Sequence, residues 1–217
     1  MLKTELIRKT EDFLKQKLEG GAYLSAHPEA GAYRLEHSYR VANIGRRIAR
    51  AEGFDETEMV VACLLHDISY CEDFGENGWR EHGRRSAAIA RPFLASLGLP
   101  AERIAEICYG IAIHVDDEAD FPGERTPFAC SVGDADNLDR IDAYRIHETL
   151  CAEDFLHKPF AEKLAFAEQR LARLRELTEL PMATRAAAAL WRERIGFYLS
   201  FYEKLAAQLR ASAAILE

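Results

Sequence analysis

A histidine and an aspartate stand side by side at the end of an apolar run, in the segment "VVACLLHDIS" over residues 60–69. Imidazole and carboxylate groups both bind metal ions, and both can accept or donate a proton. His66 and Asp67 are therefore candidate catalytic residues. A dipeptide is too short to be diagnostic by itself, so the prediction depends on whether other ligand-type residues can reach the same point.

The elements that must position this pair are helices. Apolar residues recur with a helical period along nearly the whole chain, and no segment alternates as a strand does. Asp55 and Glu58 form a capping-box pattern at the start of a helix over 56–67, which ends at the His-Asp pair. The other predicted helices span 3–19, 35–52, 81–97, 100–114, a segment from Thr126-Pro127 onward, 159–178 and 183–213. The sequence thus predicts an all-α fold.

Further ligand-type residues fall at the ends or in the middle of these helices. His37 begins the second predicted helix, and His82 begins the fourth. His114 ends the fifth helix, and Asp134 lies in the sixth. Side chains from distant helices can converge in a bundle, as metal sites in bundles do. Four imidazoles and two carboxylates suit Fe, Mn, Co, Ni or Zn better than Mg or Ca. Six ligands exceed the need of one catalytic ion with an open position, so they favour two ions with Asp67 as the bridging ligand.

The bulk composition narrows the class of protein. The chain has 217 residues, a net charge of -8 and a pI of about 5.5, which argues against nucleic acid as a partner. A small phosphorylated ligand still fits an acidic chain if metal cations neutralise the site. Five cysteines without a CxxC pair indicate reduced thiols rather than a zinc–thiolate site. The charged N-terminus and the lack of a long apolar run predict no signal peptide and no membrane span, so we expect a cytoplasmic protein.

Five segments together resemble the HD superfamily of metal-dependent phosphohydrolases, whose pattern is His…His-Asp…Asp. The segments are "LEHSYRVANIGRRIA", "ACLLHDISY", "EHGRRSAAIA", "IAIHVDD" and "SVGDADNLDR". The resemblance covers about residues 30–145. It implies an HD-domain helical bundle over residues 1–150, with residues 151–217 as additional C-terminal helices packed on the same domain.

The resemblance also implies a set of ligands. The first metal ion would be held by His37, His66, Asp67 and Asp134. His82 and His114 match the subset of the superfamily with two metals, where they would join Asp67 on the second ion. The last ligand of the family is the first Asp of a D-A-x-x-L segment, which favours Asp134 over Asp136. Asp136 lies two residues further along the helix, about 200° round its axis.

The activity implied is hydrolysis of a phosphomonoester or phosphoanhydride bond of a nucleotide or related small molecule, through a metal-activated water. His66 and Asp67 would be the catalytic residues, with one or two divalent transition metal ions (Fe, Mn, Co, Ni or Zn) as cofactors. Candidate substrate-binding residues are Arg40, Tyr70, Arg125 and Arg140.

Two other functions stay open at this stage. One is a di-iron oxygenase on the same scaffold. Many relatives carry a lysine three residues after the Asp of the pair, and Tyr70 at that position weakens the oxygenase hypothesis. The other is a non-catalytic metal or nucleotide sensor. Aromatic residues over 191–202 are expected to pack between helices, and a homodimer interface there is a second interpretation.

Overall fold

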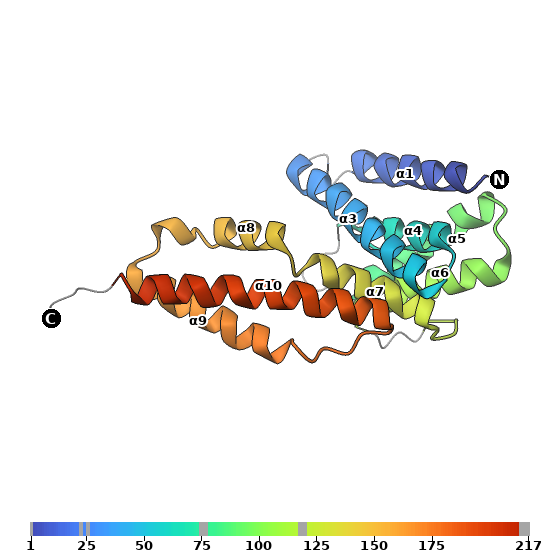
Figure 1. Cartoon of the computed structure of the whole chain (residues 1–217). Coiled ribbons are helices and arrows are strands. Elements are labelled where there is room, and N and C mark those ends of the chain that lie inside the picture. Colours follow the sequence, from blue (N-terminus) through green and yellow to red (C-terminus); the bar gives the residue numbers. More distant parts are fainter. Residues whose placement is uncertain (1, 22–23, 25–26, 74–77, 117–120, 213–217) are drawn as a thin grey trace. The chain divides into compact units, whose positions relative to one another are not determined.

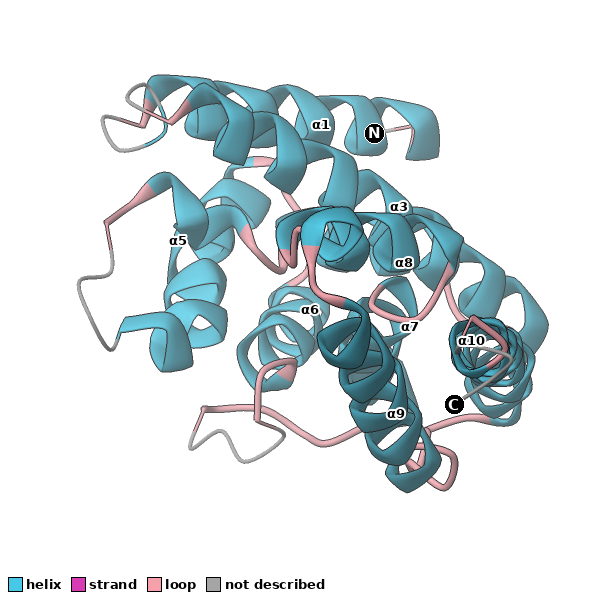
Figure 2. Cartoon of the chain, turned by 90° about the vertical axis from the view of Figure 1, so that its left-hand side faces the viewer, coloured by secondary structure: helices cyan, strands magenta, loops and turns pink. Residues whose placement is uncertain are grey.

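Every regular element in the described part of the chain is a helix, as Figure 2 shows by colour. The structure is a computed structural model, which describes residues 2–21, 24, 27–73, 78–116 and 121–212 (Figure 1). The all-α prediction is confirmed. None of the described helices is both long enough and apolar enough to cross a membrane.

The described residues form α-helices and short 3-10 helices. The α-helices are α1 (Lys3–Gly20), α3 (Pro28–Glu52), α4 (Glu56–Leu65), α5 (His82–Ser96), α6 (Ala101–Ile113), α7 (Pro127–Asp139), α8 (Ala143–Ala152), α9 (Phe160–Glu176) and α10 (Arg185–Arg210). Three short 3-10 helices are η1 (Ile68–Cys71), η2 (Gly78–Glu81) and η3 (Phe155–His157).

Helix α4 is the centre of the part that carries the His-Asp pair. Its residues from Met59 to Leu65 are all buried, and it packs against α1, α3, α6 and α7. A helix covered on every side must be apolar all round, which explains the unbroken run "MVVACLL". At its start, Asp55 Oδ1 accepts the backbone N–H of Thr57 at 2.8 Å and that of Glu58 at 3.1 Å. The predicted N-cap is therefore confirmed.

Two helices differ from the sequence prediction. Helix α3 begins at Pro28 rather than at residue 35, so His37 lies inside the helix and not at its start. Proline is favoured at the first helical position because its φ is already helical, and this is the local reason for the earlier start. Helix α8 was not among the predicted helices. Asp142 caps it by accepting the backbone N–H of Ala143 at 2.7 Å.

The chain divides into two compact units. The first comprises Met1–Asp139 with Ala183–Ala187, and the second comprises Arg140–Met182 with Ala188–Glu217. The division thus falls after Asp139 rather than near residue 150. Two carboxylates of the first unit bind Ala183–Ala187, which explains why this segment from far along the chain belongs to that unit. Asp134 Oδ2 accepts the N–H of Ala183 at 2.8 Å, and Glu52 Oε1 accepts that of Ala186 at 2.7 Å.

The second unit contains the aromatic residues near the C-terminus. Trp191, Tyr198 and Tyr202 are buried, and the indole N–H of Trp191 donates to the carbonyl of Leu177 at 2.9 Å. The ring of Tyr202 also lies against that of Phe166. These three side chains serve as packing residues, as the first interpretation of the cluster expected. The homodimer stays a prediction.

Candidate metal centre

His66 and His114 occupy equivalent places at the ends of two helices. Each is the C-cap residue of its helix, α4 and α6 respectively, and both are buried. His66 Nδ1 lies 2.7 Å from the carbonyl oxygen of Cys63, and His114 Nδ1 lies 2.6 Å from that of Ile111. A carbonyl oxygen can only accept, so each Nδ1 carries a hydrogen, and Nε2 is the ring nitrogen available to a metal ion. In this way the ring satisfies one of the last carbonyls of a buried helix and turns a ligand atom outward.

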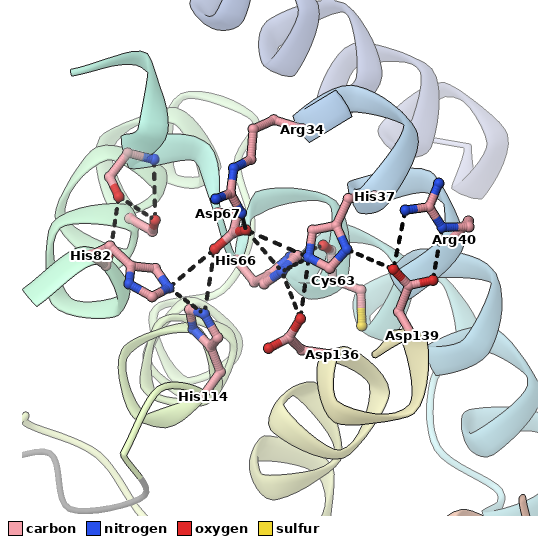
Figure 3. Close-up of polar contacts among 12 residues, drawn as sticks. Arg34, His37, Arg40, Cys63, His66, Asp67, His82, His114, Asp136 and Asp139 are labelled. Carbon is pink, nitrogen blue, oxygen red and sulfur yellow. Dashed lines mark hydrogen bonds and ion pairs between the residues drawn. The ribbon is translucent and has the colours of Figure 1, made fainter. Parts of the chain in front are cut away.

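His37 is oriented by a carboxylate instead of a carbonyl. Its Nδ1 donates to Asp139 Oδ2 at 2.8 Å, and its Nε2 lies 3.2 Å from His66 Nε2 and 3.1 Å from Asp136 Oδ1 (Figure 3). Arg40 holds Asp139 with two hydrogen bonds, of 2.8 and 3.2 Å. An oxygen acceptor on Nδ1 that fixes a ring with Nε2 free is the usual support of a metal-binding histidine.

Asp67 connects two pairs of histidines. It follows His66 directly and is the N-cap residue of η1. Its Oδ2 lies 3.5 Å from His37 Nε2 and 3.6 Å from His66 Nε2. Its Oδ1 lies 3.2 Å from His82 Nε2 and 3.5 Å from His114 Nε2. Figure 3 shows the carboxylate between the two pairs, one oxygen toward each.

The second pair requires α5 and α6 to approach closely. His82 is the first residue of α5, and its Nε2 lies 2.9 Å from that of His114. Gly83 allows this approach, because a Cβ added there would lie 2.6 Å from the carbonyl oxygen of Ala112 and 3.0 Å from that of Ile111. A side chain at this position would push the start of α5 away from the end of α6.

These donor atoms have the spacing that metal ions require. The described residues form two clusters of potential ligands, one of His37, His66 and Asp67 and one of Asp67, His82 and His114. Ligand atoms at about 2.1 Å from one ion lie about 3.0–3.4 Å from each other. The nitrogen–nitrogen distances of 3.2 and 2.9 Å fall close to this range. Nitrogen lone pairs this close repel one another unless a proton or a cation lies between them, so the residues fit a metal ion.

The two imidazoles of the first cluster have pKa values shifted in opposite directions. Burial lowers the pKa of His66 to about 4, so this ring is neutral at pH 7. Burial also acts to lower the pKa of His37, but the carboxylates of Asp136 and Asp139 outweigh it and raise this pKa to about 9. Burial alone would raise the pKa of Asp67. Hydrogen bonds from the imidazoles of His114 and His82, together with the charge of Arg34, hold this pKa well below its usual range.

The comparisons with known proteins agree with this architecture. Residues 34–141 match the family model of the HD domain. The chain carries an HD domain. The matched segment contains every residue of the two clusters. The chain also resembles the crystal structure of a predicted HD superfamily hydrolase from an uncultured Thermotogales bacterium, with 21% identity and a TM-score of 0.65. The similarity covers 96% of this chain and 99% of that one, and it shows a shared fold. No curated protein matches the chain.

The structure corrects one predicted ligand of the HD domain. Asp134 Oδ2 accepts the backbone N–H of Ala183, whereas Asp136 Oδ1 lies 3.1 Å from His37 Nε2 and 3.8 Å from His66 Nε2. The two aspartates lie about 200° apart on α7, so only one of them can face the cluster. The ligand-type carboxylate of α7 is therefore Asp136, and Asp134 anchors the segment before α10.

Arg34 and Asp139 were absent from the sequence prediction, and Asp136 was considered there but set aside in favour of Asp134. Arg34 Nη1 lies 2.7 Å from Asp67 Oδ2, and its guanidinium carbon lies 3.4 Å from the centre of the Tyr70 ring. Helical spacing is the signal that could have found them. Arg34 precedes His37 by one turn, and Asp139 follows Asp136 by one turn.

The four predicted substrate-binding residues have different surroundings in the structure. Tyr70 lies near the clusters, with its ring 5.1 Å from that of His82. Arg40 is engaged with Asp139, so it supports His37. Arg125 and Arg140 have exposed side chains, and a substrate role for them stays a prediction.

A matched pair of variants on α7 tests the ligand assignment. Asp136→Asn removes a charged oxygen from the first cluster, and we expect it to weaken metal binding by more than about 100-fold, since changes one shell further out cost about 10- to 100-fold. Asp134→Asn should retain the affinity, because its carboxylate binds a backbone N–H. Calorimetric titration with Mn²⁺ measures both affinities. Loss of metal in Asp134→Asn with retention in Asp136→Asn would reverse the assignment.

Metal binding should release a proton from the HD domain at neutral pH. In the metal-free protein the raised pKa of His37, about 9, means that this ring is protonated at pH 7. The metal must displace that proton, so affinity should increase by up to about tenfold per unit between pH 7 and 9 and then level off. Calorimetry in buffers with different ionisation enthalpies counts the protons. In Asp139→Asn the release at pH 7 should be smaller; an equal release in both proteins would contradict the role of Asp139.

Proposed function

We propose that this HD domain is a metal-dependent phosphohydrolase that cleaves a phosphomonoester or phosphoanhydride bond of a nucleotide or related small molecule. The observation that carries the proposal is the shared carboxylate of Asp67, with one oxygen toward each pair of histidines. A single structural ion needs no such arrangement. Two ions on a shared carboxylate suit the displacement of a leaving oxygen from phosphorus.

The chain offers more ligands for the first ion than for the second. The first ion would be held by His37, His66, Asp67 and Asp136. The second would be held by Asp67, His82 and His114. When bound, such ions lower the pKa of a coordinated water and neutralise charge on phosphoryl oxygens. With three protein ligands, the second cluster leaves more coordination positions for water and substrate.

Arg34 is the cation of the chain best placed to contact a phosphate. Its side chain is 25% exposed, yet its guanidinium reaches the bridging carboxylate at 2.7 Å. The face of Tyr70 lies against the guanidinium and holds its plane. A planar guanidinium can donate two hydrogen bonds to one phosphoryl group. We therefore assign phosphate binding to Arg34, with Tyr70 as the residue that orients it.

Substrate screening tests the proposed reaction. Protein loaded with Mn²⁺, Co²⁺, Ni²⁺, Fe²⁺ or Zn²⁺ should release phosphate or a nucleotide from at least one of the nucleoside phosphates, dinucleoside polyphosphates or sugar phosphates. Asp67→Asn removes charge from both clusters, so turnover should fall by more than about 100-fold with helical circular dichroism unchanged.

Three results would contradict this proposal. Oxygen consumption confined to the iron-loaded protein would favour the oxygenase. Tight nucleotide binding without turnover would favour the sensor. Undiminished hydrolysis by Asp67→Asn would show that the activity does not come from these clusters.

A matched pair of arginine variants tests the role of Arg34. Removing a hydrogen bond to a charged group costs about 1.5–3 kcal/mol. We therefore expect Arg34→Ala to lower kcat/KM by about 10- to 100-fold, mainly through KM, with metal content unchanged. Arg34→Lys should recover only part of this loss, because lysine lacks the planar fork. Arg40→Ala, which acts through Asp139, should instead weaken metal binding. Steady-state kinetics at saturating Mn²⁺ separates these effects, and an unchanged KM in Arg34→Ala would remove Arg34 from the phosphate site.

A further inference from the structure

Two buried serines link the segment after Asp67 to the start of α5. The backbone N–H of Ser69 donates to Ser86 Oγ at 3.1 Å, and Ser86 Oγ donates to Ser69 Oγ at 2.9 Å. Ser69 Oγ in turn donates to the carbonyl oxygen of His82 at 2.9 Å. Both serines have no exposed surface. These three hydrogen bonds form one continuous chain that ends on the backbone of His82.

Both serines of this series of hydrogen bonds lie close in sequence to ligands of the second cluster. Ser69 follows Asp67 by two residues in η1, and Ser86 follows His82 by one turn in α5. The chain of bonds therefore ties together two segments that supply ligands to the same cluster, although the residues lie far apart in the sequence. The rings of His66 and His114 are oriented by carbonyls of their own helices. His82 is also held through its backbone, because its carbonyl oxygen accepts the hydrogen bond from Ser69 Oγ.

We propose that Ser86 and Ser69 are positioning residues that hold His82 in place for the second metal ion. The inference rests on the proposed function, because it concerns the second metal position of that site. The first cluster takes none of its ligands from α5, and it depends on this pair only through the shared Asp67. Loss of the serine pair should thus affect one ion and spare the other. A role in general packing would affect both ions or the stability of the whole unit.

The experiment uses the full chain and Mn²⁺ as the probe. Paramagnetic resonance distinguishes isolated Mn²⁺ from a coupled pair, and titration gives the affinity of each step. For Ser86→Ala we expect the first affinity to stay within about twofold of the wild type and the second to fall by about 10- to 100-fold, the range typical of residues that orient metal ligands. The signal of the coupled pair should weaken accordingly and return at high Mn²⁺ concentration.

Two further variants complete the test. Ser96→Ala removes an exposed serine of the same helix whose hydroxyl donates to the carbonyl of Phe93, so it should bind both ions as the wild type does. Ser69→Ala removes the bond to His82 but leaves the Ser69 N–H bond to Ser86. It should weaken the second step alone, and it decides the question if Ser86→Ala does not fold.

The outcomes separate this inference from the proposed function. Two Mn²⁺ ions bound at wild-type affinity in both Ser86→Ala and Ser69→Ala would overturn the positioning role, whatever the activity. Equal weakening of both ions would do the same, as would a single Mn²⁺ per wild-type chain. If the wild type binds two ions and hydrolyses no phosphorylated compound, the proposed function fails, while selective loss of the second ion would still support the positioning role.

Discussion

The HD domain depends on one buried carboxylate and the charges that make its burial tolerable. Asp67 has 5% of its side chain exposed and is ionised, because imidazoles and Arg34 surround it. An isolated carboxylate in such a place would be costly, and a paired one is stable only if partners meet both of its oxygens. Here histidines face both oxygens, and Arg34 approaches Oδ2. Those partners come from α3, from the first residue of α5 and from the C-caps of α4 and α6.

Helices α4 and α6 each supply a histidine to the centre through the same arrangement at their C-terminal ends. A buried helix ends with carbonyl groups that need donors, and both α4 and α6 end in a histidine that donates from Nδ1 three residues back. The requirement of the helix end and the requirement of a metal ligand are thus met by one side chain. This explains why an apolar helix ends on His66 at all. A leucine there would leave a buried carbonyl without its donor and the centre without a nitrogen.

The sequence predicted where the helices lie better than it predicted which side of each helix points toward the metal centre. The apolar run and the cap at Asp55 were enough to place α4, and His66, Asp67, His82 and His114 were found because each stands at the end of an element or next to one. The choice between Asp134 and Asp136 was not predictable from motif order, since it depends on which side of α7 faces α3. Asp136 and Asp139, one turn apart on α7, both lie against His37 of α3, but the significance of this spacing appears only when the packing is known.

Arg34 illustrates a second limit of the sequence. Its contact with Asp67 joins α3 to the turn between α4 and η1, and its place on α3 depends on a helix that starts at Pro28. A helix taken to begin at residue 35 leaves Arg34 in a loop with no defined direction. The division of the chain after Asp139 was hidden for a similar reason. The first unit includes Ala183–Ala187 because the N–H groups of Ala183 and Ala186 donate to Asp134 and Glu52, and no change in composition marks this.

The charges of the centre are compatible with the phosphate binding that the proposed function requires of an acidic protein. Asp67 and Asp136 contribute two negative charges, whereas Asp139 is neutralised by Arg40. In the proposed site, two divalent ions and Arg34 would exceed the charge of these two carboxylates by three, and a phosphate dianion would reduce that excess to one. The net charge of -8 belongs to the chain as a whole and does not describe this interior. Because His82 and His114 are neutral ligands, the second cluster carries less negative charge than the first, which has Asp136 in addition to the shared Asp67. The incoming phosphate would therefore meet less repulsion on the side of the second cluster, where the protein also supplies fewer ligands.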